Sequence, residues 1–228
     1  MPPEYVEIAR AASERGEVVL RRRRESDDPD PGGAVELRVN GVFVMDTVET
    51  TTERELARAA LKQVEHPRAV LIGGLGLGFT AHEVLADPRV ERVAVVELED
   101  ALVEWMRDGT VPHGPSYLAD ERLHVVVADI RSAVAEATPA SYDLVLLDVD
   151  NGPGYLVHDA NAEVYEATFL GELAELVRPG GAVAVWSSAA SEPLADALAA
   201  VFGSVTPVAY DVDLQGRAEQ YFLYLARP

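Results

Sequence analysis

The chain has 228 residues and a formal charge of −20, with 39 Asp and Glu against 19 Lys and Arg. Such a negative surface repels phosphate backbones, so we expect no nucleic-acid partner, and a small-molecule substrate, cationic ones included, fits better. There is no cysteine, which excludes disulfides, thiol catalysis and cysteine-ligated metals. Without a signal-like start or an apolar run near the ~20 residues that span a bilayer, we expect a cytoplasmic protein with no membrane partner.

The first part of the chain predicts a small antiparallel sheet. Residues 4–15 suggest a short helix, whereas 17–24 and 34–39 have the composition of strands. Asn40-Gly41 is typical of a tight hairpin, because both residues tolerate positive φ, and it should lead into a strand at 42–45.

Between the first two of these strands lies an Asp-, Pro- and Gly-rich stretch, 25–33, which we expect to be a mobile loop. The basic run Arg21–Arg24 invites a nucleic-acid interpretation. However, alternate residues of a strand point to opposite faces and acids follow at once, so we interpret the run as a solvated edge strand.

The remainder alternates helical and apolar segments, which predicts an α/β fold with a doubly wound, mostly parallel seven-stranded sheet. A helix at 52–61 with a hydroxyl cap should lead into the sheet. The expected strands are 70–73, 93–97, 123–128, 143–148, 182–186, 205–212 and 221–226, and the expected helices 79–86, 99–107, 131–137, 162–177 and 193–202. We divide the chain into a small N-terminal β-sheet region, 1–50, and an α/β nucleoside-binding domain, 51–228.

The most informative motif is Val70-Leu-Ile-Gly-Gly-Leu-Gly-Leu-Gly78, followed nineteen residues later by Glu97 at the end of a second apolar run. A strand that turns into a helix through glycines lets backbone amides approach a ligand closely. An acid at the tip of the next strand can accept both hydroxyls of a ribose. The spacing therefore predicts a nucleoside site.

Four acids lie at the carboxyl ends of strands in the expected sheet: Glu97, Asp129, Asp148 and Asp150. Each alone would suit a helix cap or a solvated turn, but together at the ligand-binding edge they favour a pocket. Asp129 could accept the exocyclic amine of an adenine, with Ile130 against the ring face. Asp148 would face the reacting end of the ligand, as a general base or as the partner of a substrate ammonium.

Three other features allow alternative interpretations. Gly76-Leu-Gly-Phe-Thr-Ala81 fits a dinucleotide fingerprint, so an NAD-dependent oxidoreductase remains open, although no hydride-transfer apparatus follows. Asp148-Val-Asp150 suggests a metal-dependent methyltransferase, but the second acidic pair of such sites is missing and we expect no metal. His158 could accept a proton near neutral pH, although loop histidines are commonly only solvated.

The stretch from Val70 to Glu97 resembles the polyamine aminopropyltransferases, or spermidine synthases, which have the class I S-adenosylmethionine-dependent methyltransferase (Rossmann-like) fold. It keeps the landmarks Glu83, Pro88, Val90 and Glu91 as well as Glu97. The likeness extends to Thr52-Glu-Arg54, to Val127-Ala-Asp129 and to the strand that ends in Asp148. The resemblance implies a transferase that binds S-adenosylmethionine or its decarboxylated form and alkylates a small acceptor.

What the resemblance implies about the site can be stated by residue. The cofactor-binding residues would be Gly74, Gly76, Leu77, Gly78, Glu97, Leu98, Asp129, Ile130 and Asp148, and the catalytic residues Asp148, Asp150 and His158. A homodimer through the N-terminal sheet is also expected.

The chain departs from the family at residues that recognise polyamines. Leu77 stands where the glycine loop of the family carries an Asp, and Asn151 replaces the second acid after Asp148, with Asp150 as a substitute. Methyl transfer from intact S-adenosylmethionine, whose carboxylate the loop amides could receive, is therefore an alternative. A non-catalytic nucleoside-binding paralogue is another.

Overall fold

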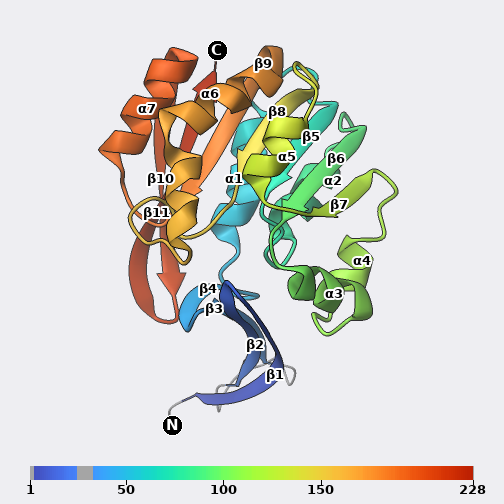
Figure 1. Ribbon diagram of the computed structural model, residues 1–228. Coiled ribbons are helices and arrows are strands. Elements are labelled where there is room, and N and C mark those ends of the chain that lie inside the picture. The colour runs from blue at the N-terminus through green and yellow to red at the C-terminus, as the bar shows by residue number, and fades with distance from the viewer. Residues whose placement is uncertain (1–2, 25–32, 228) are drawn as a thin grey trace.

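The computed structural model describes residues 3–24 and 33–227, so the loop expected at 25–33 lies, apart from Gly33, outside the described residues. A small sheet lies beneath a larger α/β layer structure (Figure 1). The small sheet is antiparallel, in the order β1-β2-β3-β4. Its strands are β1 (Glu4–Ser13), β2 (Gly16–Arg24), β3 (Ala34–Val39) and β4 (Val42–Asp46). Asn40 and Gly41 have φ of 51° and 77°, so the predicted hairpin between β3 and β4 is confirmed.

The helix expected at 4–15 is wrong, because this segment forms strand β1. Its residues pair along β2 from Glu4 opposite Arg24 to Ser13 opposite Gly16. The side chain of Arg10 also bridges to Glu17 on the neighbouring strand. Pairing satisfies the backbone groups of β2 that would otherwise form an open edge, and this gain is invisible in the local pattern.

The interpretation of Arg21–Arg24 as a solvated edge strand is also wrong, since β2 lies between β1 and β3. Arg21 lies 2.6 Å from a carboxylate oxygen of Glu36, whose side chain is fully buried. Arg23 is buried and lies 3.4 Å from Asp46. The small sheet therefore uses part of this basic run to neutralise interior acids, as buried carboxylates require.

The larger sheet confirms the predicted fold class. Its order is β10-β11-β9-β8-β5-β6-β7, parallel from β9 to β7, with β11 and β10 added antiparallel. Its strands are β5 (Ala69–Gly73), β6 (Arg92–Glu97), β7 (Leu123–Val127), β8 (Tyr142–Leu147), β9 (Val177–Ser187), β10 (Ser204–Leu214) and β11 (Arg217–Arg227). The central strands are almost wholly apolar because both of their faces are covered.

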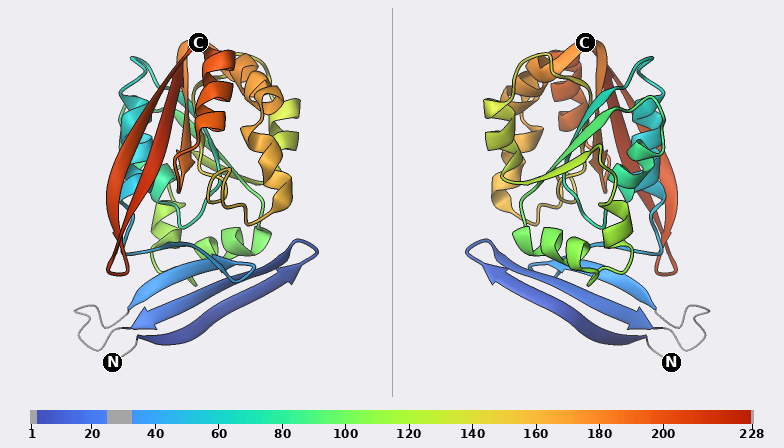
Figure 2. Two further views of the ribbon diagram at one scale, coloured as in Figure 1. Left: turned by 90° about the vertical axis from the view of Figure 1, so that its left-hand side faces the viewer. Right: turned by 90° about the vertical axis from the view of Figure 1, so that its right-hand side faces the viewer.

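Helices cover the two faces of the larger sheet (Figure 2). Against one face lie α1 (Thr51–Leu61), α2 (Phe79–Leu85), α3 (Asp100–Asp108) and the short α4 (Gly114–Tyr117). Against the other lie α5 (Ile130–Glu136), α6 (Ala167–Leu176) and α7 (Glu192–Phe202). The helix expected at 162–177 is instead a 3₁₀ helix, η1 (Asp159–Tyr165), followed by α6.

The start of α1 differs from the expectation in one detail. Its N-cap residue, Thr50, makes no side-chain capping bond. The hydroxyl of Thr52 is buried instead and accepts a hydrogen bond of 3.0 Å from the indole of Trp186 on β9. This hydroxyl therefore fixes the helix to the sheet rather than capping it.

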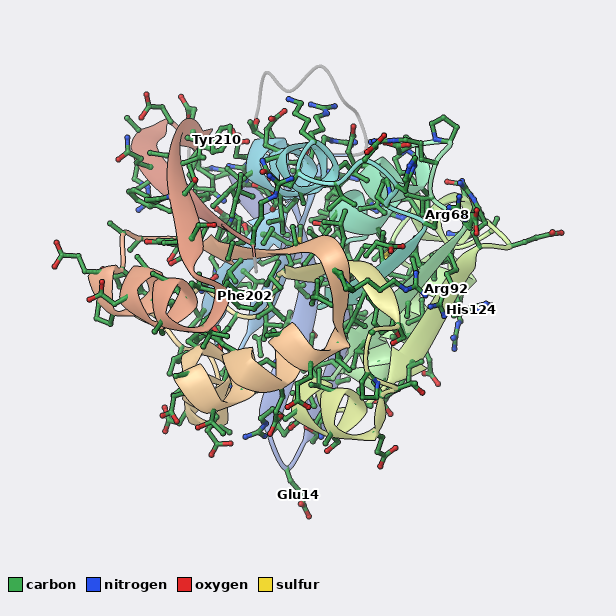
Figure 3. The ribbon with its side chains drawn as sticks, turned by 90° about the horizontal axis from the view of Figure 1, so that it is seen from above. Glu14, Arg68, Arg92, His124, Phe202 and Tyr210 are labelled. Carbon is green, nitrogen blue, oxygen red and sulfur yellow. The ribbon has the colours of Figure 1, made fainter. Side chains whose placement is uncertain are left out.

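The carboxyl ends of the parallel strands face the small sheet. Arg68, Arg92 and His124 lie near the opposite, amino ends, at one side of the view from above (Figure 3). Buried side chains of the small sheet, among them Leu37 and Met45, belong to the same apolar cluster as α1 and β5. No helix in the described parts of the chain is long and apolar enough to cross a membrane.

Candidate functional site

The glycine loop after β5 runs closely between the ends of two neighbouring strands. The amide of Gly74 donates to the carbonyl of Val96 at 2.8 Å. A Cβ at Gly74 would lie 2.1 Å from the carbonyl oxygen of Asp148, and the φ of Gly74 is 94°. At Gly76 a Cβ would lie 2.7 Å from the sulfur of Met45. These approaches explain why the loop is built from glycine.

Leu77 and Gly78 belong to the loop but do not line the pocket. The side chain of Leu77 is fully buried in the core, and its amide points to the sulfur of Met45 at 3.2 Å. Nε2 of His113 lies 2.8 Å from the carbonyl oxygen of Leu77, to which it can only donate. Burial lowers the pKa of His113, which favours the neutral ring. The ring thus holds the glycine loop through a residue that does not line the pocket.

Glu97 ends β6 with its side chain almost completely buried. One carboxylate oxygen accepts from the amide of Leu75 and the other from the amide of Glu99, both at 2.8 Å. Burial raises the pKa of Glu97, and the two backbone bonds partly offset this. Because a carboxylate oxygen has two lone pairs, each still has acceptor capacity for a hydroxyl in the pocket. Leu98, the next residue, also lines the pocket.

Asp129 is the N-cap of α5. Its carboxylate accepts from the amide of Arg131 at 2.8 Å and pairs with the guanidinium of the same residue at 2.6 Å. These bonds hold the pKa of Asp129 below its usual range. Ile130, which follows, is buried against the pocket. A ligand amine at this end would therefore share Asp129 with Arg131.

Asp148 follows β8 and is held by a residue from the glycine-loop helix. The hydroxyl of Thr80 donates to Oδ2 of Asp148 at 2.6 Å. Burial raises the pKa of Asp148 to about 6, and the bond from Thr80 limits the rise. Glu53, at the start of α1, lies close enough that burial and the charge of Asp148 together raise its pKa to about 8.

Asp150 organises the loop that follows Asp148. Its φ is 60°, and its carboxylate accepts from the amides of Val157 and His158, at 2.6 and 3.2 Å, and from the side-chain amide of Asn161 at 2.9 Å. It also accepts from the amide of Asn151 at 2.7 Å. The acid expected to contact substrate is thus occupied with shaping the loop.

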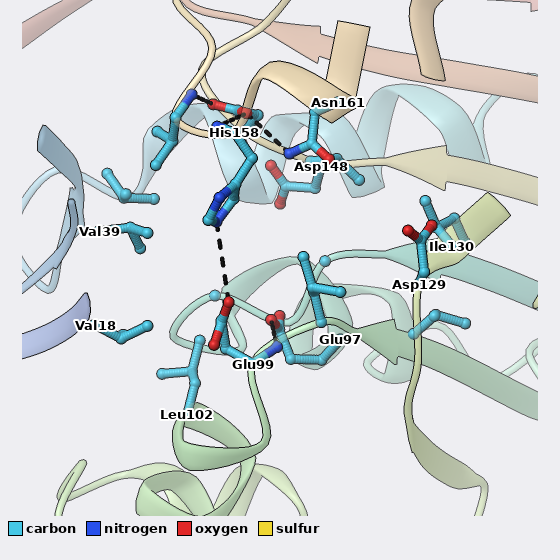
Figure 4. Close-up of a pocket in the computed structure, with 18 of the residues that line it drawn as sticks. Val18, Val39, Glu97, Glu99, Leu102, Asp129, Ile130, Asp148, His158 and Asn161 are labelled. Atoms are coloured by element: carbon cyan, nitrogen blue, oxygen red, sulfur yellow. Dashed lines mark hydrogen bonds and ion pairs between the residues drawn. The ribbon is translucent and has the colours of Figure 1, made fainter. Parts of the chain in front are cut away.

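His158, on the same loop, reaches across the pocket. Its Nε2 lies 3.9 Å from a carboxylate oxygen of Glu99 (Figure 4). Glu99 also pairs at 2.9 Å with Arg15, in the turn between β1 and β2. The side chain of Asn40, at the β3–β4 turn, donates to the carbonyl of Val157 at 3.5 Å. The loop therefore closes one side of the pocket against the small sheet.

These groups line one pocket, whose empty space of about 790 Å³ includes open solvent. Nine of the predicted site residues line it: Gly74, Gly76, Glu97, Leu98, Asp129, Ile130, Asp148, Asp150 and His158. In Figure 4, Asp129 and Ile130 lie at one end, Val18 and Val39 at the other, and Glu97, Glu99, Asp148 and His158 between them. Within residues 3–24 and 33–227, no group of three or more His, Asp or Glu side chains could hold a metal ion.

Several residues that shape the site were not predicted from the sequence. Thr80 could have been predicted from its position, because it places a hydroxyl in the first helical turn after the glycine loop. Glu99 and Glu53 stand among many acids of ordinary appearance. Four valine and leucine side chains of the small sheet reach the pocket only because the two sheets are stacked: Val18, Leu37, Val39 and Val44.

Comparison with known proteins agrees with this arrangement. Residues 49–196 match the spermine/spermidine synthase domain. The chain is 36% identical over 134 residues to polyamine aminopropyltransferase 2 of Pseudomonas aeruginosa. The matched region covers 57% of this chain and 36% of that protein. It is 29% identical over 153 residues to putrescine N-methyltransferase 3 of Nicotiana tabacum, covering 66% of this chain and 36% of that protein. The chain thus spans about a third of the length of these curated relatives.

Solved structures show the same fold. A spermidine synthase in complex with the transition-state analogue AdoDATO superposes with a TM-score of 0.81 at 17% identity, over 96% of this chain and 73% of that chain. The spermidine synthase of Thermotoga maritima gives 0.79 at 18% identity, over 96% and 72%. With a matching domain that covers more than half of its residues, this chain belongs to the spermine/spermidine synthase family.

Proposed function

We propose that the protein is a transferase that binds S-adenosylmethionine or its decarboxylated form and alkylates a small amine. The observation that carries the proposal is the convergence of Glu97, Ile130 and Asp148 on one pocket beside the glycine loop. Glu97 supplies acceptors for ribose hydroxyls, Ile130 an apolar surface for an adenine, and Asp148 a carboxylate at the reacting end. The family membership supports the same assignment.

The residues present fit an S-adenosyl nucleoside. Glu97 is buried at the pocket wall with acceptor capacity left on both oxygens. Gly74 and Gly76 line the pocket without side chains, so a ligand can lie against the backbone there. No Lys or Arg lines this pocket among the described residues, and the acids around it suit a sulfonium, which carries a positive charge.

Asp148 would act on the acceptor. When bound, the sulfonium would supply an electrophilic carbon to the acceptor nitrogen and a neutral thioether as the leaving group. The attacking amine must first lose its ammonium proton, and Asp148 is the pocket carboxylate placed to receive or relay it. Because the pKa of Asp148 is raised to about 6, it is ionised at neutral pH but a better base than an exposed Asp. Beyond this, catalysis needs mainly alignment and exclusion of water.

Methyl transfer is the second candidate, and the position of Leu77 favours it. Aminopropyl transfer from the decarboxylated cofactor requires the free ammonium of the transferred group to be held. At the glycine loop this chain offers Leu77, whose side chain is fully buried in the core. Methyl transfer makes no such demand, since the transferred group carries no charge.

The test is calorimetry with S-adenosylmethionine, decarboxylated S-adenosylmethionine and methylthioadenosine, followed by product analysis with small amines. We expect micromolar binding of at least one nucleoside, and turnover that Asp148→Asn lowers by about 100-fold or more while nucleoside affinity stays within a few-fold. S-adenosylhomocysteine as product would identify methyl transfer, and methylthioadenosine would identify aminopropyl transfer. Absence of binding to all three nucleosides refutes the proposal, and binding without any turnover would identify a non-catalytic paralogue.

A further inference from the structure

Five carboxylates line the pocket, but most are already engaged by the protein itself. Glu97 accepts from two backbone amides at 2.8 Å. Asp150 accepts from three backbone amides and from the side chain of Asn161. Accepting several structural hydrogen bonds uses the lone pairs of a carboxylate and partly neutralises its charge. Neither Glu97 nor Asp150 is therefore a strong site for an additional ammonium.

The carboxylates of Glu99 and Asp129 are neutralised by guanidinium groups. Arg15 donates to Glu99 at 2.9 and 3.2 Å, and Arg131 lies 2.6 Å from Asp129. Both arginines line an adjoining pocket, which shares Leu98, Asp129 and His158 with this one. An ammonium ligand would have to displace a guanidinium to use either acid.

Asp148 is different. Among the described residues its side chain has one hydrogen-bond donor, the hydroxyl of Thr80 on Oδ2, which leaves Oδ1 for a ligand. Glu53 lies nearby but does not line the pocket. The pKa of Glu53 is about 8, because of burial and the charge of Asp148, so this neighbour is mostly protonated at pH 7. The pocket therefore offers one carboxylate with free capacity for a cation.

The end of the pocket farthest from Asp129 is aliphatic. Val18 and Val39 lie there in Figure 4, and Leu37, Val44 and Leu102 complete the lining. Of these five, Val18, Leu37 and Leu102 are buried. A second ammonium placed against these side chains would lose water without gaining a carboxylate, which is strongly unfavourable. An alkyl chain there would gain from burial.

On the basis of the proposed transferase function, we propose that the acceptor is a monoamine with an aliphatic body, rather than a diamine. Its amine faces Asp148, and its carbon chain lies against the valines of the small sheet. The preference for one amine over two follows because, of the five carboxylates that line the pocket, Asp148 is the one with free capacity for a cation.

The experiment compares n-butylamine with putrescine, which has the same four-carbon chain and a second amine. Protein saturated with methylthioadenosine is titrated with each by calorimetry at 150 mM salt, where the long-range attraction of the acidic surface for a dication is screened. We expect n-butylamine to bind at least 10-fold more tightly. Equal or tighter binding of putrescine, or binding of neither amine, overturns the inference.

A pair of variants tests where the carbon chain of the acceptor lies. Val39 is half-buried at the aliphatic end, and Val42 is exposed on the same sheet away from the pocket. Val39→Asp should bring the two affinities within about 3-fold or reverse their order, whereas the matched control Val42→Asp should keep the wild-type preference. An unchanged preference in folded Val39→Asp, checked by circular dichroism, contradicts the placement. Failure of S-adenosylmethionine, its decarboxylated form and methylthioadenosine alike to bind, by contrast, would remove the proposed function itself, and the inference with it.

Discussion

The hydroxyl of Thr80 donates a 2.6 Å hydrogen bond to the carboxylate of Asp148, joining the first turn of α2 to the end of β8. The two residues are 68 positions apart in the sequence. Thr80 is itself almost fully buried, so the bond is shielded from water and strengthens accordingly. It holds Asp148 in one orientation and favours its ionised form, against the effect of burial.

Thr80→Val should therefore raise the pKa of Asp148 above about 6. Loss of a hydrogen bond to a charged group is worth about 1.5 kcal/mol, or about one pH unit. If Asp148 is the base, kcat/KM increases with pH through its pKa, and this limb should move up by about one unit in the variant. The measurement is a pH–rate profile from pH 5 to 9. Thr80→Ser, which keeps the hydroxyl, should restore the wild-type profile, and an unshifted limb in Thr80→Val would exclude Asp148 as the titrating group.

Glu97→Gln should weaken nucleoside binding. The substitution removes the charge and turns one oxygen into an amide that faces a backbone N–H donor instead of accepting from it. Two ribose hydroxyls lose a charged acceptor, so the Kd for methylthioadenosine should rise about 10- to 100-fold by calorimetry. Glu104→Gln, an exposed acid on the following helix, is the matched control and should leave the Kd unchanged. Equal affinities for wild type and Glu97→Gln would place the ribose elsewhere.

Stability should fall as the pH rises through the neutral range. The folded protein raises the pKa of Glu53 to about 8 and that of Asp148 to about 6, so it holds these protons more tightly than the unfolded chain does. Their stabilising effect is complete at acid pH and is lost as the pH rises through the folded-state values. Glu53→Gln cannot ionise, so its loss of stability between pH 6 and 9 should be smaller by about 2 kcal/mol.

Urea denaturation at the two pH values measures this difference. Glu65→Gln removes a strongly exposed acid and should show the wild-type pH dependence. A Glu53→Gln profile parallel to wild type would mean that Glu53 is solvated and ionised throughout.

Gly74→Ala should disrupt the pocket, whereas Gly180→Ala should not. Both glycines have positive φ, 94° and 82°, so both substitutions cost about 1 kcal/mol in backbone strain. Only at Gly74 would the new Cβ collide with backbone, 2.1 Å from the carbonyl oxygen of Asp148, while Gly180 has nothing within 4 Å. Nucleoside affinity and melting temperature should drop far more in Gly74→Ala, and similar losses in the two variants would contradict the close approach.

Local sequence patterns were enough to predict the α/β framework and the edge of the sheet at which the pocket lies. Apolar runs and helical periodicity identified the strands and helices because each pattern depends on neighbours along the chain. Glycine spacing identified the loop, and position at strand ends brought Glu97, Asp129 and Asp148 to one pocket. These are consequences of local pattern and of the geometry of parallel sheets.

The partners of those side chains depend instead on contacts between segments that are distant in the sequence. The segment expected to be helical at 4–15 forms strand β1 because it pairs with the backbone of β2. Arg23 can be buried because the carboxylate of Asp46 lies close to it. Asp150 is occupied by amides that the chain reaches 7 and 8 residues later, and Thr80 meets Asp148 from another helix. Hydrogen bonding and burial between distant segments are long-range properties, so the sequence shows which acids reach the pocket but not which of them remains free to bind a ligand.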